Sequence, residues 1–161
     1  MAVRVASLVA LVVAALSLGP SFAHVLEAPP RLSVWTPELW RAATVFNGQF
    51  AWFAVIGAPV DLGAVAAAGW FAWLLRDRRP AFAFALAGTL LFAAGLAAWF
   101  GLVAPANAVL ATWTPGPLPA DFDDIRLRWE TGHMVVAALK FCALVAVAAA
   151  AVTANGRSRL S

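Results

Sequence analysis

The chain has 161 residues, of which 63% are hydrophobic and only 12% are charged, and its formal net charge at pH 7 is +3. Its mean hydropathy of +0.85 excludes an ordinary water-soluble domain and indicates an integral membrane protein. The positive charge comes from arginines near the ends of apolar stretches. Because these arginines form no continuous basic surface, the charge bears on membrane orientation, and we expect no binding of nucleic acid.

Four apolar stretches predict four transmembrane helices. A hydrocarbon core of about 30 Å takes about 20 apolar residues per helix, so a chain of this length has room for four crossings with short connections. We therefore expect a single domain over residues 1–161, an all-α integral membrane fold built as an antiparallel bundle of four transmembrane helices. The helices are predicted near residues 3–25, 45–75, 81–104 and 125–153.

The connections between these stretches differ in character. Residues 27–44 contain two adjacent prolines together with Trp35 and Trp40, and tryptophan is enriched at membrane–water interfaces, so this connection is expected at the level of the lipid headgroups. Residues 76–80 form a short basic turn. Residues 105–124 are rich in proline and end in aspartates that can cap the start of the last helix.

The N-terminal stretch has a second interpretation. An early arginine, an apolar run and the small-x-small triplet Ser21-Phe22-Ala23 resemble a secretory signal peptide with its cleavage site. Cleavage there would leave three spans and make His24 the first residue, whose amine and ring together suit copper. We expect the stretch to be retained, because it is long enough to span the membrane.

The distribution of arginine predicts orientation, because short loops rich in basic residues stay in the cytoplasm. We expect a multi-pass protein of a bacterial-type inner (plasma) membrane with both termini in the cytoplasm. The predicted cytoplasmic end has Arg4, Arg76, Arg78, Arg79, Arg157 and Arg159. The opposite end has Arg31, Arg41, Arg126 and Arg128 together with the acids Glu27, Glu38, Asp121, Asp123, Asp124 and Glu130.

Two short acid-and-histidine pairs are the best indication of function. His24-x-x-Glu27 ends the first predicted helix, and Glu130-x-x-His133 begins the fourth. Residues three apart lie on nearly the same face of a helix, so each pair can direct an imidazole and a carboxylate at one point. In an antiparallel bundle both pairs fall at the same depth, near the outer membrane face.

Amide side chains are expected at that depth as well. Asn47 and Gln49 begin the second predicted helix, and Asn107 ends the third. The sequence therefore predicts a polar cluster of two imidazoles, two carboxylates and two or three amides near the outer face.

Three interpretations of this cluster remain open. The first is plain interfacial structure, in which Glu27 pairs with Arg31 and Arg126 pairs with Glu130. The second is a polar pocket that handles a substrate or protons. The third is a site for a single transition-metal ion (iron, manganese, zinc or copper), since imidazole and carboxylate suit these metals. Its ligands would be His24, Glu27, Glu130 and His133.

Two further charges fall near the middle of predicted helices, Asp61 in the second and Lys140 in the fourth. An isolated charge at that depth costs roughly 2.5 kcal/mol or more on insertion scales, so the two are expected to face each other or a cavity. As a structural pair they would fix the packing of the two helices. As a functional pair they would relay protons toward the outer cluster.

Several segments together resemble a known family, the small four-helix bacterial membrane proteins grouped with fungal anthrone oxygenases. In order and spacing the resemblance covers nearly the whole chain, and it implies that the first helix belongs to the domain. The fungal enzymes act on activated phenolic anthrones without a cofactor. The matching segments are His24-Val-Leu-Glu27-Ala-Pro-Pro-Arg-Leu, Phe46-Asn47, Val103-Ala-Pro-Ala-Asn107 and Arg128-Trp129-Glu130-Thr-Gly-His133.

The resemblance implies a membrane oxidoreductase or oxygenase whose substrate is a phenolic or quinol-like compound entering from the outer leaflet. The general base would be His24 or His133, and the acid that orients its ring would be Glu27 or Glu130. The donor of hydrogen bonds to the developing oxyanion would be Asn47 or Asn107. Transport or binding, which would need a continuous polar path across the membrane, and a non-catalytic accessory role remain as alternatives. The expected partners are membrane lipid, a small aromatic substrate and further copies of the chain.

Overall fold

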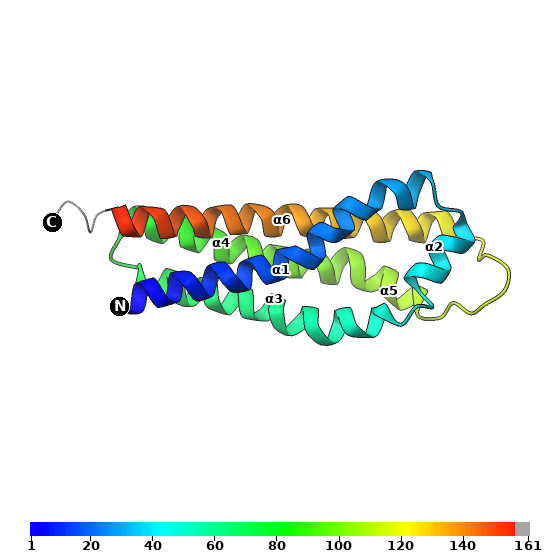
Figure 1. Ribbon diagram of the computed structural model, residues 1–161, viewed down its shortest axis with the longest axis horizontal. Helices are drawn as coiled ribbons and strands as arrows, with labels where there is room; N and C mark the ends of the chain where they lie inside the picture. The colour runs from blue at the N-terminus through cyan, green and yellow to red at the C-terminus, as the bar shows by residue number, and fades with distance from the viewer. Residues whose placement is uncertain (157–161) are drawn as a thin grey trace.

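Four long apolar helices run antiparallel in the computed structural model, and the start of the first helix and the end of the last helix lie at one end of the bundle (Figure 1). The structure describes residues 1–156, except for the side chains of residues 49–51, 54, 155 and 156. Within that part, four helical segments are long and apolar enough to cross a membrane: Ala2–Ser33, Val55–Leu74, Arg79–Leu110 and Phe122–Ala154. The predicted all-α bundle of four candidate membrane spans is therefore confirmed.

The first helix, α1 (Ala2–Ser33), extends past the end predicted near residue 25. It continues through Pro29 and Pro30, each of which lacks the N–H that an interior helical residue donates to the fourth residue before it. Because α1 ends within one turn of Pro30, these two prolines remove hydrogen bonds of its last turns only, whereas Pro20 removes one in the middle of the helix. The continuation places Arg31 seven residues after His24, on the same face of one helix.

The connection after α1 contains a short helix, α2 (Pro37–Thr44). The Thr36 side chain caps its start by accepting a hydrogen bond from the backbone N–H of Leu39 at 3.3 Å, and Pro37 occupies the first turn, where a missing N–H costs little. The chain then turns at Gly48, whose φ of 76° lies in the left-handed region that glycine adopts readily. This turn starts α3 (Gln49–Leu74).

The third span is divided into three parts by a π-helical turn. It consists of α4 (Arg79–Ala98), η1 (Trp99–Val103) and α5 (Ala104–Leu110), so it extends past the predicted end at residue 104. A π turn shifts the faces that the following residues present, and such turns are frequent at functional sites. The fourth span, α6 (Phe122–Gly156), packs against α1 and α4.

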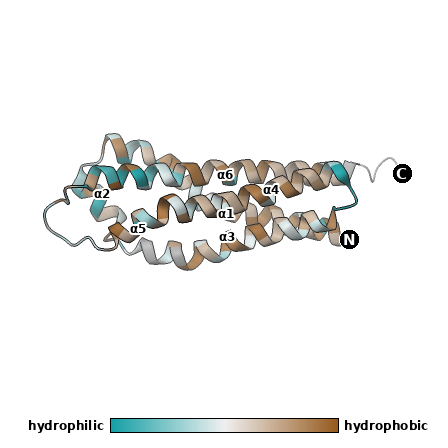
Figure 2. Ribbon diagram, turned by 180° about the vertical axis from the view of Figure 1, so that it is seen from behind, coloured by the Kyte–Doolittle hydropathy of each residue, from teal (hydrophilic) through white to brown (hydrophobic). Residues whose placement is uncertain are grey.

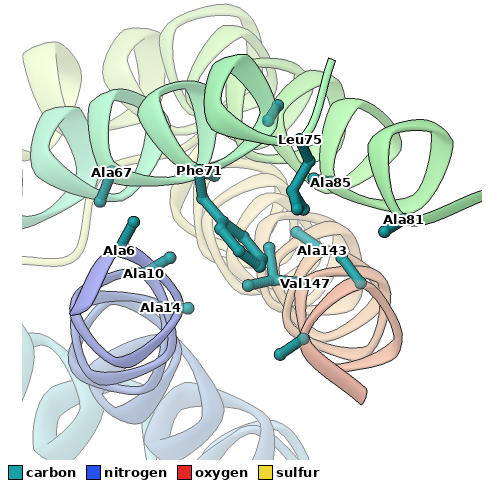
Figure 3. Close-up of a cluster of buried hydrophobic side chains, with 14 of the residues drawn as sticks. Ala6, Ala10, Ala14, Ala67, Phe71, Leu75, Ala81, Ala85, Ala143 and Val147 are labelled. Carbon is teal, nitrogen blue, oxygen red and sulfur yellow. The ribbon is translucent and has the colours of Figure 1, made fainter. Parts of the chain in front are cut away.

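The end of the bundle that holds the chain termini has a core of small apolar residues. Alanines spaced four residues apart on α1 meet alanines of α3, and Figure 3 shows the Phe71 ring of α3 directed toward Val147 of α6. Small side chains allow the helices to approach closely. The buried residues labelled in Figure 3 are Ala6, Ala10, Ala14, Ala67, Phe71, Leu75, Ala81, Ala85, Ala143 and Val147.

The opposite end of the bundle, called here the α2 end, has a different character. Its buried apolar residues include two tryptophans and come from α2, α5, η1 and α6. Hydrophilic residues gather there on α2 and on the first turns of α6, whereas the middle of the bundle is hydrophobic (Figure 2). The buried apolar residues are Trp40, Val103, Ala106, Leu110, Phe122, Ile125, Trp129 and Val136.

Candidate functional site

A polar stripe on the buried face of α1 leads from the middle of the bundle to the α2 end. Ser17, Ser21, His24 and Arg31 are buried and recur at intervals of three, four or seven residues, which keeps them on one side of the helix. This side of α1 packs against α6. The stripe therefore faces the first half of α6, where the second acid-and-histidine pair lies.

The two histidines of the chain meet between α1 and α6. The rings of His24 and His133 are stacked, with centroids 4.0 Å apart and an interplanar angle of 22°. The Trp129 ring lies 5.1 Å from the His24 ring and 4.3 Å from the His133 ring, and the Phe53 ring of α3 lies 5.5 Å from that of His24. The imidazole pair is thus enclosed on two sides by aromatic rings.

Arg31 contacts three members of the predicted cluster. Its Nη1 atom lies 3.3 Å from Nδ1 of His24 and 4.0 Å from Oε1 of Glu130. Its Nη2 atom forms an ion pair with Glu27, one turn earlier on α1. The guanidinium carbon also lies 5.6 Å from the centroid of the Trp129 ring. Arg31 is only 6% exposed, so its contacts with His24 and Glu130 are made inside the protein, whereas the Glu27 side chain is 52% exposed.

Glu130 is fully buried and is held by a residue of α2. The indole Nε1 of Trp40 donates a hydrogen bond to Oε1 of Glu130 at 2.8 Å. Arg126, considered from the sequence as a partner of Glu130, instead pairs with Asp123 at 3.0 Å, one turn earlier on α6. The contacts of Glu130 therefore cross the bundle rather than follow its own helix.

The two asparagines occupy different places. Asn107, on α5, accepts a hydrogen bond from Nε1 of Trp129 at 2.8 Å, which ties α5 to the aromatic wall of the histidine pair. Asn47 is exposed in the turn between α2 and α3, and its amide donates to the carbonyl of Ala43. The side chain of Gln49 lies outside the described residues.

The two carboxylates of the site, Glu27 and Glu130, have different closest partners and do not point at a common position. Among the residues that the structure describes, no group of three or more His, Cys, Asp or Glu side chains is placed to hold a metal ion. Glu27 faces Arg31, and Glu130 faces Trp40. The four predicted metal ligands therefore do not converge in this arrangement.

The structure also brings Asp61 and Lys140 together. The Nζ atom of Lys140 lies 2.7 and 2.8 Å from the two carboxylate oxygens of Asp61, 3.0 Å from Oγ of Ser21 and 3.3 Å from the carbonyl oxygen of Ser17. The hydroxyl of Ser17 donates to Asp61 at 2.7 Å. This cluster joins α1, α3 and α6 at the inner end of the polar stripe.

Beyond Asp61 and Lys140, toward the chain termini, the described interior is apolar. The buried residues in that half are almost all alanine, with phenylalanine, leucine and valine. Ser7 is buried there, but its hydroxyl donates to the carbonyl of Arg4 within α1. The polar stripe therefore connects the middle of the bundle with the α2 end alone.

Sequence reasoning gave no central role to Arg31, Trp40, Ser17 or Ser21. The spacing of the serines and of Arg31 relative to His24 is a readable signal, because it extends one helical face through both prolines. Trp40 has no comparable signal, since its contact with Glu130 joins residues that are far apart in the chain.

Comparisons with known protein families, with curated proteins and with solved structures give no match for this chain. Helix length and hydropathy make it a multi-pass membrane protein.

Proposed function

We propose that the protein is a membrane oxidoreductase similar to the anthrone oxygenases, acting on a lipid-soluble phenolic or quinol-like substrate at the His24–His133 pair. The observation that carries this proposal is the stacking of the chain's two histidines, 4.0 Å apart, inside an aromatic enclosure. Imidazole is the commonest general base in enzymes, and aromatic walls suit an aromatic substrate.

The segments that carry the family resemblance support the proposal by their contacts. The segment with His24 and the segment with His133 meet directly at the stacked rings. The segment with Asn107 joins them through its hydrogen bond with Trp129. Three segments that are distant in sequence therefore contribute to one site.

The chemistry that such a site can perform is proton abstraction followed by reaction with oxygen. For an anthrone, an imidazole removes a proton from the ring methylene carbon, and the resulting carbanion is electron-rich enough to reduce O₂. One oxygen atom becomes the new carbonyl of the anthraquinone, and the other leaves as water with the two methylene hydrogens. Anthrone and O₂ thus give anthraquinone and water, and no external reductant is needed.

A route for a lipid-soluble substrate passes Phe53. This side chain is 44% exposed, yet its ring lies 5.5 Å from the ring of His24. In a membrane the exposed part of Phe53 would contact lipid. We propose that the α2 end faces the outer leaflet of a bacterial-type inner membrane and that substrate enters from that leaflet beside Phe53.

The transport alternative has less support. It would need a polar path across the whole bundle, whereas the polar stripe of the described residues ends at the Asp61–Lys140 cluster. An accessory role for the protein predicts that substitutions at the two histidines are tolerated.

The decisive experiment measures oxygen consumption by membranes containing the protein, with anthrone as the substrate. We expect one O₂ consumed per anthrone and a loss of rate of roughly 100-fold or more in His133→Ala, as for removal of a general base. Membrane abundance should stay unchanged. The matched control is Thr131→Ala, which alters an exposed residue on the same helix and should keep the activity.

Two results would refute the proposal. One is a wild-type rate no higher than that of membranes lacking the protein. The other is an equal loss of activity and abundance in His133→Ala, which would make the histidine a folding residue.

A further inference from the structure

Arg31 and His24, which contact each other, both belong to α1. The two residues are seven positions apart on α1, and Nη1 of Arg31 lies 3.3 Å from Nδ1 of His24. Their exposed fractions are 6% and 8%, so water does not compete strongly for either group. The ion pair with Glu27 holds the guanidinium from its other side.

The direction of this hydrogen bond follows from the chemistry of its two partners. A guanidinium group has five N–H donors, no acceptor, and does not lose its proton in proteins. The Nδ1 atom of His24 must therefore accept, which requires a free lone pair there. The hydrogen bond at one ring nitrogen sets which nitrogen carries the proton, so His24 has its proton on Nε2.

His133 is in a different situation. Within the described part of the chain no hydrogen bond to either of its ring nitrogens is found, and its contacts are the rings of His24 and Trp129. A proton added to Nδ1 of His24 would point at the Arg31 guanidinium and break the hydrogen bond. A proton added to His133 breaks no hydrogen bond.

We infer that Arg31 is a positioning residue that fixes His24 as the Nε2–H tautomer and thereby leaves His133 as the general base. His24 then donates from Nε2 to the oxygen of the substrate, while His133 takes the proton from its carbon. This division of roles rests on the proposed function, but the tautomer of His24 can be measured without any turnover.

The test is ¹⁵N NMR of the full-length protein, labelled at histidine, purified through an affinity tag that contains no histidine and reconstituted in lipid. The chain has only two histidines, so a spectrum of His133→Gln assigns both. We expect the wild-type His24 to show a protonated Nε2 and an unprotonated Nδ1 as a single species. In Arg31→Met this single species should be lost and replaced by a mixture of tautomers or a protonated ring.

The matched control is Arg41→Met. Arg41 has the same exposed fraction of 6%, but its guanidinium donates to the carbonyls of Gly116 and Pro117. This variant should leave the His24 signals unchanged. Should Arg31→Met fail to fold, the wild-type spectrum still decides, and Arg31→Lys provides a second variant that keeps the charge beside Glu27.

A wild-type His24 with its proton on Nδ1 would overturn the inference. An Arg31→Met spectrum identical to wild type would also overturn it, as would an equal change in Arg41→Met. The expected tautomer without any oxygen consumption would refute the oxygenase proposal and leave the positioning role intact. Oxygen consumption that depends on His133, together with a His24 proton on Nδ1, would support the oxygenase proposal and refute the positioning role of Arg31.

Discussion

Lys140 keeps its ammonium group inside the bundle because four oxygen atoms surround its three N–H bonds. Two belong to Asp61, and the others are the hydroxyl of Ser21 and the carbonyl of Ser17. The side chains of Lys140 and Asp61 are 6% and 15% exposed. A buried ion pair with this many hydrogen bonds is stable as a unit, but either charge alone is not.

We therefore expect Lys140→Met to lower the free energy of unfolding by about 3–5 kcal/mol, because it leaves the Asp61 carboxylate buried without a counter-charge. The measurement is the unfolding midpoint in a denaturing-detergent titration of the purified protein. The double variant Lys140→Met, Asp61→Asn removes both charges and should recover a large part of the loss. A double variant as unstable as Lys140→Met would mean that the pair contributes through packing rather than charge.

At the scale of elements, α4 packs tightly against α6 at Gly88. A Cβ atom added there would lie 2.7 Å from Cγ2 of Val147 and 3.1 Å from the carbonyl oxygen of Ala143. The second of these is backbone and cannot rotate away. The same addition at Gly95, two turns later on α4, would meet Lys140 Cγ at 3.6 Å, an ordinary contact.

Gly88→Ala should consequently destabilise the protein by about 1–3 kcal/mol, as overpacking of a tight interface does. Gly95→Ala should be neutral or slightly stabilising, since alanine favours a helix over glycine by up to about 1 kcal/mol. Thermal unfolding of both variants in the same mild detergent provides the comparison. Equal midpoints for the two variants would contradict the prediction, because they would mean that α4 and α6 can move apart at position 88 without loss of stability.

The long helices could be predicted from the sequence, whereas their irregular parts could not. Apolar length alone identifies a span, because any segment of about 20 apolar residues satisfies the bilayer. The continuation of α1 through Pro29 and Pro30, the short helix α2 and the π turn η1 were all absent from the prediction. For α2 a local signal exists, because Thr36 caps its start and Pro37 lies in its first turn, whereas Pro29, Pro30 and the π turn have no such signal.

For the whole molecule, the meeting of the two histidines followed from topology. The end of the first span and the start of the fourth share one depth in any antiparallel bundle of four, so the meeting of His24 and His133 was predictable. Their individual partners were not. Arg31 reaches His24 only because α1 extends past its predicted end, and Trp40 reaches Glu130 only because α2 folds back over the bundle.

The two ends of the bundle also differ in how their arginines are used. At the α2 end Arg31 pairs with Glu27, Arg41 donates to loop carbonyls and Arg126 pairs with Asp123. At the terminus end the arginines of the α3–α4 turn are exposed, and the ion pair found there, between Arg76 and Asp77, is loose at 3.9 Å. Arg157 and Arg159 lie outside the described residues. Arg128, at the α2 end, is exposed as well, so the predicted orientation rests on the larger number of arginines at the terminus end.

Both termini should accordingly lie in the cytoplasm, because exposed basic loops resist export. In a bacterial host, alkaline phosphatase inserted in the 111–121 loop should be active, while phosphatase fused to the C-terminus should be inactive and green fluorescent protein fused there should fluoresce. Replacing Arg76, Arg78 and Arg79 with alanine should give mixed orientation, whereas replacing Arg126 and Arg128 should not. Active phosphatase at the C-terminus of the unaltered chain would reverse the orientation and place the histidine pair near the cytoplasmic leaflet, where the substrate would have to enter from inside the cell.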